Sequence, residues 1–318
     1  MGGRQNGVGA MARKRRGQPV HGWVVIDKPR GLTSTQVVGR VRRAFDAQKV
    51  GHGGTLDPLA TGLLPIALGE ATKTTAYVMD GAKSYGFTLR WGQATSTDDS
   101  EGEVVAEHDK RPTRAEIEAA LPRFLGEIEQ VPPAYSAVKI DGQRAYDLAR
   151  AKQDFTISPR RVRIDRFELL SMDDEDRASF AVDCGKGCYM RSLARDLGQA
   201  VGSLAHIITL RRQAVGPFRE ADAISLESLE AVGHSAAALE HLLPVETALD
   251  DIPALALAEM EANRLRCGQA VSLIARANRE RIRDLTQGAV VCAMSAGRPV
   301  ALARFEAGEL RPIRVLNL

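Results

Sequence analysis

The sequence has no long hydrophobic segment, and this absence limits where the protein can work. No run of apolar residues in the 318-residue chain approaches the ~20 residues of a transmembrane helix. The N-terminus, MGGRQNGVGAMARKRRGQPV, has basic residues but no apolar core of a secretory signal, and Asn6 stands where a myristoylation site requires Ser or Thr. The sequence therefore excludes a membrane protein and predicts a cytoplasmic location. The patternless, Gly-rich residues before Met11 also suggest that Met11 is the true start.

Cysteine is scarce as well, with four residues in the whole chain. Four cysteines spread over this length do not form a disulfide framework, so we expect reduced thiols. Cys184 and Cys188 resemble half a zinc site, but no second pair of ligands accompanies them. A P-loop is also missing, because no Gly-Lys-Ser/Thr triplet follows the glycine-rich segment at 51–54. We expect neither a metal nor a cofactor.

The protein has only a small excess of positive charge, with a net charge of +3. The basic residues are nevertheless clustered along the sequence. The first 20 residues hold five basic residues and no acid, and further clusters are RVRR at 40–43, SPRRVR at 158–163 and LRRQ at 210–213. Each cluster alone is equally consistent with a solvated surface. Together they favour a polyanionic partner.

The length predicts two domains, one large and one small. A boundary is indicated near ALDDIP at 248–253. Beyond it we expect one helix at 258–266 and hairpin strands around SAGR and EAGE, a pattern typical of a small barrel. The predicted organisation is a basic flexible tail at 1–19, a main domain at 20–250 and a small domain at 251–318.

Strand and helix signals in the main domain alternate irregularly. GWVVIDKPRG (22–31) is typical of a buried strand, and Thr33 with Gln36 predicts a capping box for the helix that follows. A helix is expected over EATKTTAYVMD (70–80), and SYGFTLRWG (84–92) has the alternation of a strand.

Further along, Thr113 and Glu116 predict the start of another helix. RRVRIDRFELL (160–170) and ASFAVDCGKGCY (178–189) are expected to pair as a hairpin, with a helix over MRSLARDLGQAVG (190–202). Because there is no strict strand–helix repeat, the predicted fold class is α+β.

The segment GHGGTLDPLATG (51–62) places one carboxylate, Asp57, in a rigid loop before Pro58. Proline restricts the preceding residue to extended dihedrals, and glycines let the backbone approach a partner closely. No second acid lies nearby in the sequence, which argues against the paired carboxylates of a glycosidase. The pattern alone leaves open whether Asp57 is a nucleophile or base, or caps a turn.

Four blocks occur in a family-specific order: VIDKPRGLTS, GHGGTLDPLATGLLPIALGEATK, KSYGFTLRWG and GKGCYMRSLARDLG. Over roughly residues 20–220 the sequence thus resembles the TruB family of pseudouridine synthases, which isomerise uridine 55 in the T-loop of transfer RNA. The ATK after the loop and the modest length resemble the stand-alone bacterial form, not the guide-RNA-dependent relatives. Cys188 and Met190 depart from the threonine and isoleucine common in the family, but neither position must ionise.

The resemblance implies a pseudouridine synthase catalytic fold, with a mixed, largely antiparallel sheet and flanking helices, and a PUA-like RNA-binding domain at 251–318. It implies a tRNA pseudouridine(55) synthase that uses no cofactor, because the reaction neither oxidises nor hydrolyses. By resemblance, Asp57 is the catalytic aspartate, Arg191 its salt-bridge partner, and Tyr85 stacks on the base and is implicated in removing the C5 proton. A guanidinium beside a carboxylate favours its ionised form.

The resemblance also implies that His52 packs where the target base leaves its stack and that Leu210 covers the pocket. Flipping a nucleotide costs a few kcal/mol, which RNA contacts must offset. We expect such contacts from Lys28, Lys186 and Tyr189, whereas Arg211 and Arg212 could equally face solvent. The implied partner is the T stem-loop of tRNA, with no guide RNA and no membrane, and we expect a monomer.

Two other classes of protein would share some of these sequence features. A noncatalytic RNA-binding or RNA-folding protein would have the basic clusters and the small barrel but would not need an aimed acid. A sugar-processing enzyme would use Asp57 on a free nucleoside or glycoside. Whether Asp57 attacks the sugar or removes a ribose proton also stays open at this point.

Overall fold

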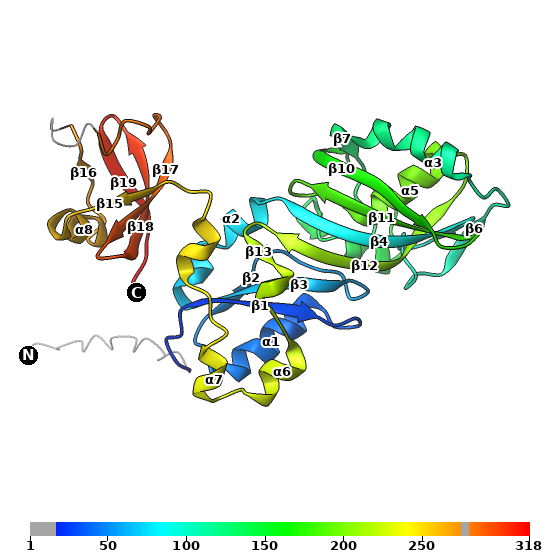
Figure 1. Cartoon of the computed structure of the whole chain (residues 1–318). Helices are drawn as coiled ribbons and strands as arrows, with labels where there is room; N and C mark the ends of the chain where they lie inside the picture. The colour runs from blue at the N-terminus through cyan, green and yellow to red at the C-terminus, as the bar shows by residue number, and fades with distance from the viewer. Residues whose placement is uncertain (1–16, 275–279) are drawn as a thin grey trace, which may run out of the picture.

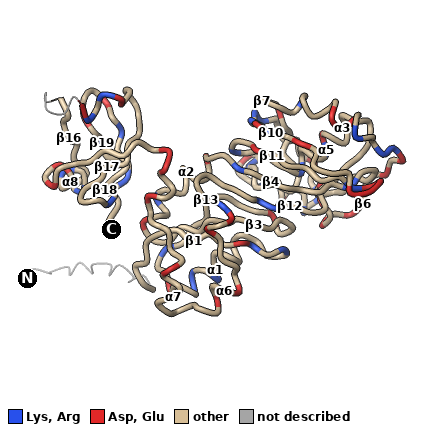
Figure 2. Tube along the Cα trace, viewed as in Figure 1, with Lys and Arg blue, Asp and Glu red and all other residues tan. Residues whose placement is uncertain are grey.

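The computed structural model describes residues 17–274 and 280–318. Figure 1 shows a large sheet flanked by helices, and a separate small sheet with one helix beside it. Acidic and basic residues are interspersed along both parts of the trace (Figure 2). The predicted start at Met11 and most of the predicted tail lie outside the described residues. Among the described residues, no helix has the length and apolar character needed to cross a membrane.

The large sheet is mixed and largely antiparallel, which confirms the predicted α+β class. Its strands are β1 (Gly22–Lys28), β2 (Val50–His52), β3 (Thr61–Leu68), β4 (Lys83–Trp91), β7 (Gly126–Gln130), β10 (Arg160–Met172), β11 (Arg177–Cys184), β12 (Ala205–Val215), β13 (Phe218–Arg219) and β14 (Ala223–Ser225). The main path runs β14-β1-β3-β12-β4-β11-β10-β7, with β2 beside β3 and β13 beside β12. The β1–β14 and β3–β12 pairs are parallel.

Short helices and two small hairpins surround this sheet. The α-helices are α1 (Ser34–Ala44), α2 (Thr75–Asp80), α3 (Arg114–Ala120), α4 (Ala145–Arg150), α5 (Met190–Ala200), α6 (Leu226–Ala231) and α7 (Ala236–Leu239). The 3-10 helices are η1 (Gly69–Lys73), η2 (Leu121–Phe124), η3 (Glu220–Asp222) and η4 (Val245–Leu249). The hairpins pair β5 (Gln93–Thr95) with β6 (Val104–Glu107), and β8 (Lys139–Ile140) with β9 (Gln143–Arg144).

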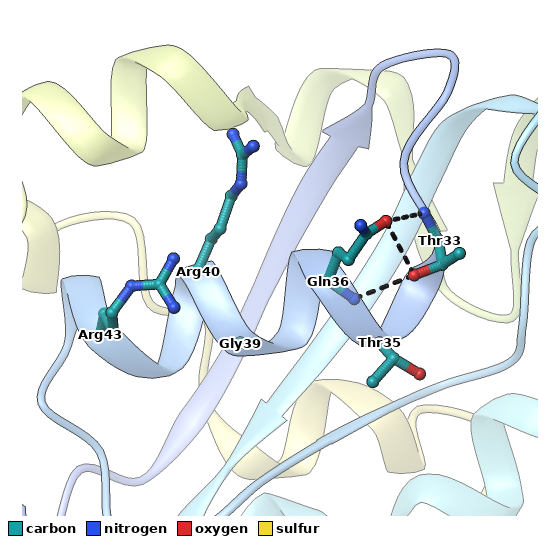
Figure 3. A pocket seen from close by; sticks show the side chains of 6 residues that line it. All are labelled: Thr33, Thr35, Gln36, Gly39, Arg40 and Arg43. Atoms are coloured by element: carbon teal, nitrogen blue, oxygen red, sulfur yellow. Dashed lines mark hydrogen bonds between the residues drawn. The ribbon is translucent and has the colours of Figure 1, made fainter.

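Several predicted elements are confirmed where local signals are strong. Buried and half-buried residues alternate along β4, and β10 pairs antiparallel with β11 as the predicted hairpin. The capping box at the start of α1 is complete: the Gln36 amide N–H donates to Thr33 Oγ1 at 3.2 Å, and the Thr33 N–H donates to Gln36 Oε1 at 2.8 Å (Figure 3). A second complete capping box begins α3 at Thr113.

The helix predicted over residues 70–80 is wrong as a single element. The chain forms the 3-10 helix η1 and then α2, with a break at Thr74. The Thr74 hydroxyl donates to the Ala71 carbonyl at 2.8 Å, and Thr72 Oγ1 donates to the Gly69 carbonyl at 2.7 Å. Such side-chain bonds compete with the backbone bonds of an α-helix, which accounts for the break.

Strand β1, next to the edge strand β14, has a core on both of its faces. Val24 and Ile26 belong to the larger apolar cluster, which α1 and α5 cover. Trp23 and Val25 point the other way, into a cluster that includes Phe218 and Leu316. A strand buried on both sides is expected to be apolar throughout, as this one is.

The second sheet begins at Ala254, after η4. It is formed by β15 (Ala254–Ala256), β16 (Val271–Ser272), β17 (Val290–Ser295), β18 (Arg298–Glu306) and β19 (Glu309–Val315), in the order β15-β17-β18-β19-β16. The expected helix is α8 (Glu259–Arg266), and the expected hairpin turns join β17 to β18 and β18 to β19. This sheet has a hydrophobic core of its own.

The end of β19 reaches back to the large sheet. Lys73 Nζ donates to the Val315 carbonyl at 2.7 Å, and the Asn317 N–H donates to Glu70 Oε2 at 2.8 Å. Leu316 is buried in the cluster that contains Trp23. These contacts attach the small sheet to η1 and to one face of the large sheet.

Gly62, at the start of β3, is a position that only glycine fits. Its φ is +95°, and an added Cβ would lie 2.2 Å from the Arg212 carbonyl oxygen of β12. On its other side, Gly62 pairs with Lys28 of β1. The close approach lets β3 pair with β12 directly after the loop that carries Asp57.

We expect Gly62→Ala to lower the free energy of unfolding by more than ~2 kcal/mol, because backbone overlap adds to the ~1–2 kcal/mol cost of a positive φ. Gly31→Ala is the matched control: Gly31 has a φ of +88° but nothing within 4 Å of an added Cβ. Urea denaturation followed by tryptophan fluorescence measures both, since Trp23 and Trp91 lie in the large sheet. An equal loss in the two variants would contradict the role of the close approach.

Candidate active site

A groove of about 1060 Å³ lies over strands β4 and β12. Its walls are the loop between β2 and β3, the start of α1, the turn after β5, the segment around β8 and α4, and the stretch that leads into α5. Six of the eight predicted site residues line it: His52, Asp57, Tyr85, Tyr189, Arg191 and Leu210. Lys28 and Lys186 are not among the lining residues.

The loop that carries Asp57 is held on the start of α1. The Leu56 N–H donates to Ser34 Oγ at 2.9 Å, and Ser34 Oγ donates to the Leu56 carbonyl at 3.0 Å. Gly54 has a φ of +126°, and a Cβ on Gly53 would overlap the Val78 side chain. These glycines therefore permit a turn that residues with side chains would resist.

Arg191, in the first turn of α5, lies between two carboxylates. Its Nε is 2.9 Å from Asp57 Oδ2 and 3.7 Å from Asp99 Oδ2. The Arg191 and Asp99 side chains are only 5% and 4% exposed, whereas Asp57 is 36% exposed. The buried guanidinium thus holds the one acid of this group that is open to the groove.

The remaining nitrogens of Arg191 reach two other walls. Nη1 donates to the Thr97 carbonyl at 3.0 Å, and Nη2 donates to the Tyr135 carbonyl at 2.9 Å. One side chain therefore joins the turn after β5, the segment before β8 and the Asp57 loop. Arg195, one turn later, pairs with Asp98 at 3.1 Å.

No second acid lies near Asp57 in the sequence, but the fold brings two acids into the same groove. Asp99 and Glu101 both line the groove, and Asp99 Oδ1 accepts hydrogen bonds from Thr97 Oγ1 at 2.6 Å and from the Glu101 N–H at 3.0 Å. Burial, with the neighbouring Asp99 and Asp57 carboxylates, raises the pKa of Glu101. Asp57 and Asp99 contact the same guanidinium, unlike glycosidase acids, which face each other across the scissile bond.

Tyr85 and Leu210 form part of the floor. Strand pairing sets Tyr85 of β4 opposite Arg212 of β12, and Leu210 opposite Phe87. Burial raises the pKa of Tyr85, and the Arg212 guanidinium opposes this rise by its charge and by hydrogen bonding. The Tyr85 phenol is therefore buried, and Arg212 is the cation on the neighbouring strand.

His52 lines the rim of the groove next to the glycines. Its Nδ1 accepts a hydrogen bond from the Gly54 N–H at 3.3 Å. Burial, and then the positive charge of Arg212, lower the pKa of His52 below its ordinary value. The ring is accordingly neutral at neutral pH, which suits a face that packs against a base.

The structure corrects the prediction that Lys28 contacts RNA. The Lys28 side chain is fully buried, and its Nζ donates to the carbonyls of Pro29 (2.9 Å), Leu32 (2.7 Å) and Pro58 (3.2 Å). Burial lowers the pKa of Lys28 to about 8, although the Asp57 carboxylate favours its charged form. Lys28 supports the loop from inside the protein.

Lys186 and Tyr189 lie on the stretch before α5. The Lys186 side chain is 67% exposed and pairs with Asp80 at 3.1 Å, outside the groove lining. The Tyr189 backbone is fixed by Gln130, whose amide accepts from its N–H at 2.8 Å and donates to its carbonyl at 3.1 Å. Substrate contact by both residues stays a prediction.

Among the groove residues to which the sequence analysis assigned no site role, Arg212 and Asp99 lie closest to the argument about Asp57. Arg212 had a signal: once Leu210 faces the pocket, the alternation of a strand places Arg212 on the same side and Arg211 on the other. Arg211 does point away and pairs with Asp27 at 3.0 Å. Asp99 had no such signal, because a turn has no periodicity.

The exposed face of α1 has a second, shallower pocket of about 540 Å³. Thr33 and Thr35 line both this pocket and the groove, and Arg40 and Arg43 line its far end (Figure 3). Arg40 makes a loose ion pair of 3.7 Å with Glu230. A basic surface therefore continues from the groove along α1.

Potential metal ligands are dispersed. All four cysteines are free thiols. No group of three or more His, Cys, Asp or Glu side chains that could hold a metal ion occurs within residues 17–274 and 280–318.

Comparison with known sequences gives consistent matches. A family model described as TruB family pseudouridylate synthase (N terminal domain) matches residues 42–190, and one described as tRNA pseudouridylate synthase B C-terminal domain matches residues 191–250. The chain is 56% identical to tRNA pseudouridine synthase B of Rhodospirillum rubrum, over 97% of this chain and all of the relative. It is 52% identical to the protein of the same name from Caulobacter vibrioides, with the same coverage.

Solved structures resemble the whole fold. A crystal structure of a Cbf5-Nop10-Gar1 complex contains a chain that matches with a TM-score of 0.71 and 25% identity, over 93% of this chain and 85% of that chain. An H/ACA RNP bound to a substrate RNA containing 2′-deoxyuridine matches with a TM-score of 0.72 and 22% identity, over 97% and 92%. These likenesses confirm the predicted fold of both sheets.

Proposed function

Because this chain belongs to the TruB family of pseudouridylate synthases, we propose that it converts uridine 55 in the T-loop of a transfer RNA to pseudouridine. One observation carries the proposal: an accessible carboxylate, Asp57, is ion-paired with the buried Arg191 in a groove whose floor contains Tyr85. The names of the close relatives support transfer RNA as the substrate.

The proposed reaction needs one aimed acid. The N1–C1′ bond of uridine breaks, the base turns, and C5 joins C1′, while C5 loses a proton and N1 gains one. Asp57 acts at the ribose, either as nucleophile on C1′ or as the base that removes a sugar proton. Arg191 is ion-paired with the carboxylate and holds it in place while a base packs over it. Tyr85 lies in the floor, where it can stack on the base. Because burial raises its pKa, the phenol must give up its own proton before it can take the proton of C5.

RNA binding is proposed to involve the rim of the groove. The nucleotide must leave its stack, and phosphate contacts must offset that cost. Lys139, Arg144 and Arg150 line the groove, and the basic face of α1 adjoins it. His52, Tyr189 and Leu210 are the proposed contacts of the flipped nucleotide.

We also propose a domain organisation, an oligomeric state and a cellular location for the protein. We assign residues 20–250 to the catalytic domain and 251–318 to a PUA-like RNA-binding domain, preceded by a basic tail at 1–19. The separate core of the second sheet supports this division. We propose a monomer that acts in the cytoplasm without a guide RNA.

The central prediction concerns Asp57→Asn, which keeps the size of the side chain but removes its negative charge. RNA binding should be retained, whereas RNA labelled with tritium at uridine C5 should release no label above background, because C5 loses its hydrogen only when it bonds C1′. The native protein should release the label. Asp176→Asn is the matched control, since Asp176 is ion-paired with Arg111 and does not line the groove.

Release by Asp57→Asn within about tenfold of the native rate, a barrier change of only ~1.4 kcal/mol, would show that Asp57 is not the essential acid. A noncatalytic RNA binder would release nothing with any variant. A sugar-processing enzyme would act on free nucleoside without the stem-loop. The purified chain is assayed with RNA alone, so the experiment also tests independence from a guide RNA.

Arg191→Lys should lower the rate of tritium release at least ~100-fold, or ~2.7 kcal/mol, although the charge is kept. An ammonium cannot bind Asp57 and also donate to the carbonyls of Thr97 and Tyr135. Arg195→Lys, one helical turn later, should stay within about threefold of native. Near-native release by Arg191→Lys would refute the assignment.

Removal of residues 251–318 should weaken RNA binding more than it slows isomerisation, measured in single turnover at saturating RNA. Since Leu316 packs against the catalytic domain, Leu316→Ala serves as the control that loses this contact but keeps the small sheet. A truncated protein that binds RNA normally yet cannot isomerise it would refute the assigned role of the domain.

A further inference from the structure

Arg212 of β12 is a buried cation that lines the groove. Its side chain is 1% exposed, in the middle of the large sheet. Within the part of the chain that the structure describes, no carboxylate forms an ion pair with it. A buried charge without an opposite charge is costly, so its retention calls for a specific set of partners.

Those partners are backbone carbonyls on both sides of Asp57. Nη2 donates to the Gly54 carbonyl at 3.1 Å and Nη1 to the Thr55 carbonyl at 3.3 Å, both in the loop before Asp57. Nε donates to the Leu63 carbonyl at 2.8 Å, at the start of β3 after the loop. The guanidinium thus bridges the two ends of the loop.

Arg212 also faces the tyrosine of the floor. It lies opposite Tyr85 in the pairing of β12 with β4, and its positive charge opposes the rise in the pKa of Tyr85 that burial causes. The same side chain therefore binds the loop that presents Asp57 and lies opposite the tyrosine in the floor of the groove. Both side chains line one groove.

We propose that Arg212 is a positioning residue that sets the distance between the Asp57 loop and Tyr85, so that the carboxylate and the phenol act on the same nucleotide. This inference rests on the function proposed above. Arg212 acts through the groups it holds, because its donors are engaged by Gly54, Thr55 and Leu63. A displacement of 1 Å in such a site can cost ~100-fold in rate.

The adjacent residue provides a matched comparison. Arg211 is on the same strand but points to the other side, where it pairs with Asp27 and Glu220. Arg211→Lys and Arg212→Lys change the same atoms and keep the same net charge, so they compare the exposed, ion-paired side of the strand with the buried side that holds the loop. Lysine at 212 supplies one ammonium in place of the planar fork that reaches three carbonyls.

The test measures single-turnover tritium release at saturating T stem-loop RNA, together with the Kd for that RNA. We expect Arg212→Lys to lower the release rate about 100-fold while Kd changes less than about threefold, and Arg211→Lys to stay within about threefold of native in both. Melting temperatures are measured for all proteins, and each is assayed equally far below its own. A defect of stability alone would vanish under this matching.

A second variant, Arg212→Gln, keeps amide donors without the charge and should also lose rate more than affinity. Rates of both variants within about threefold of native, or a rate defect that disappears at matched temperatures, would overturn the positioning role. Absence of release by the native protein would reject the proposed function itself. The two failures are therefore distinguishable.

Discussion

The ion pair between Asp57 and Arg191 is the contact on which the rest of the site depends. Asp57 lies between β2 and β3, and Arg191 begins α5, so the pair forms only when distant parts of the fold are assembled. Asp99 holds the guanidinium from a third segment. Arg191 is therefore a buried cation that several segments of the chain hold in position. Its partner Asp57 stays accessible from the groove.

The loop around Asp57 is rich in glycine and so offers few side chains by which it could be held. The protein uses its carbonyl groups instead: Lys28 binds the carbonyl of Pro58, and Arg212 binds those of Gly54 and Thr55. Long cationic side chains can reach such carbonyls from within the core. Their burial is costly, but it leaves the groove side of the loop free for a substrate.

Local patterns predicted much of the fold, and the family resemblance supplied six residues that line the groove, but the contacts between site residues were not predicted. The capping box at Thr33 and the alternation along β4 are properties of neighbouring residues, so they were recognisable. Strand β3 was missed because Pro65 interrupts a continuous apolar run. Asp57 was identified by its motif, but the contact of Asp99 with Arg191 depends on tertiary structure, to which no spacing in the sequence corresponds.

The pairing of Arg212 with the Asp57 loop also orders events during synthesis. Thr55 and Arg212 are 157 residues apart, so the loop leaves the ribosome long before its buried donor exists. Closing so large a loop is slow compared with forming helices or local hairpins. The loop therefore reaches its working conformation only after β12 has been translated, and the nascent chain carries an unassembled active site until then.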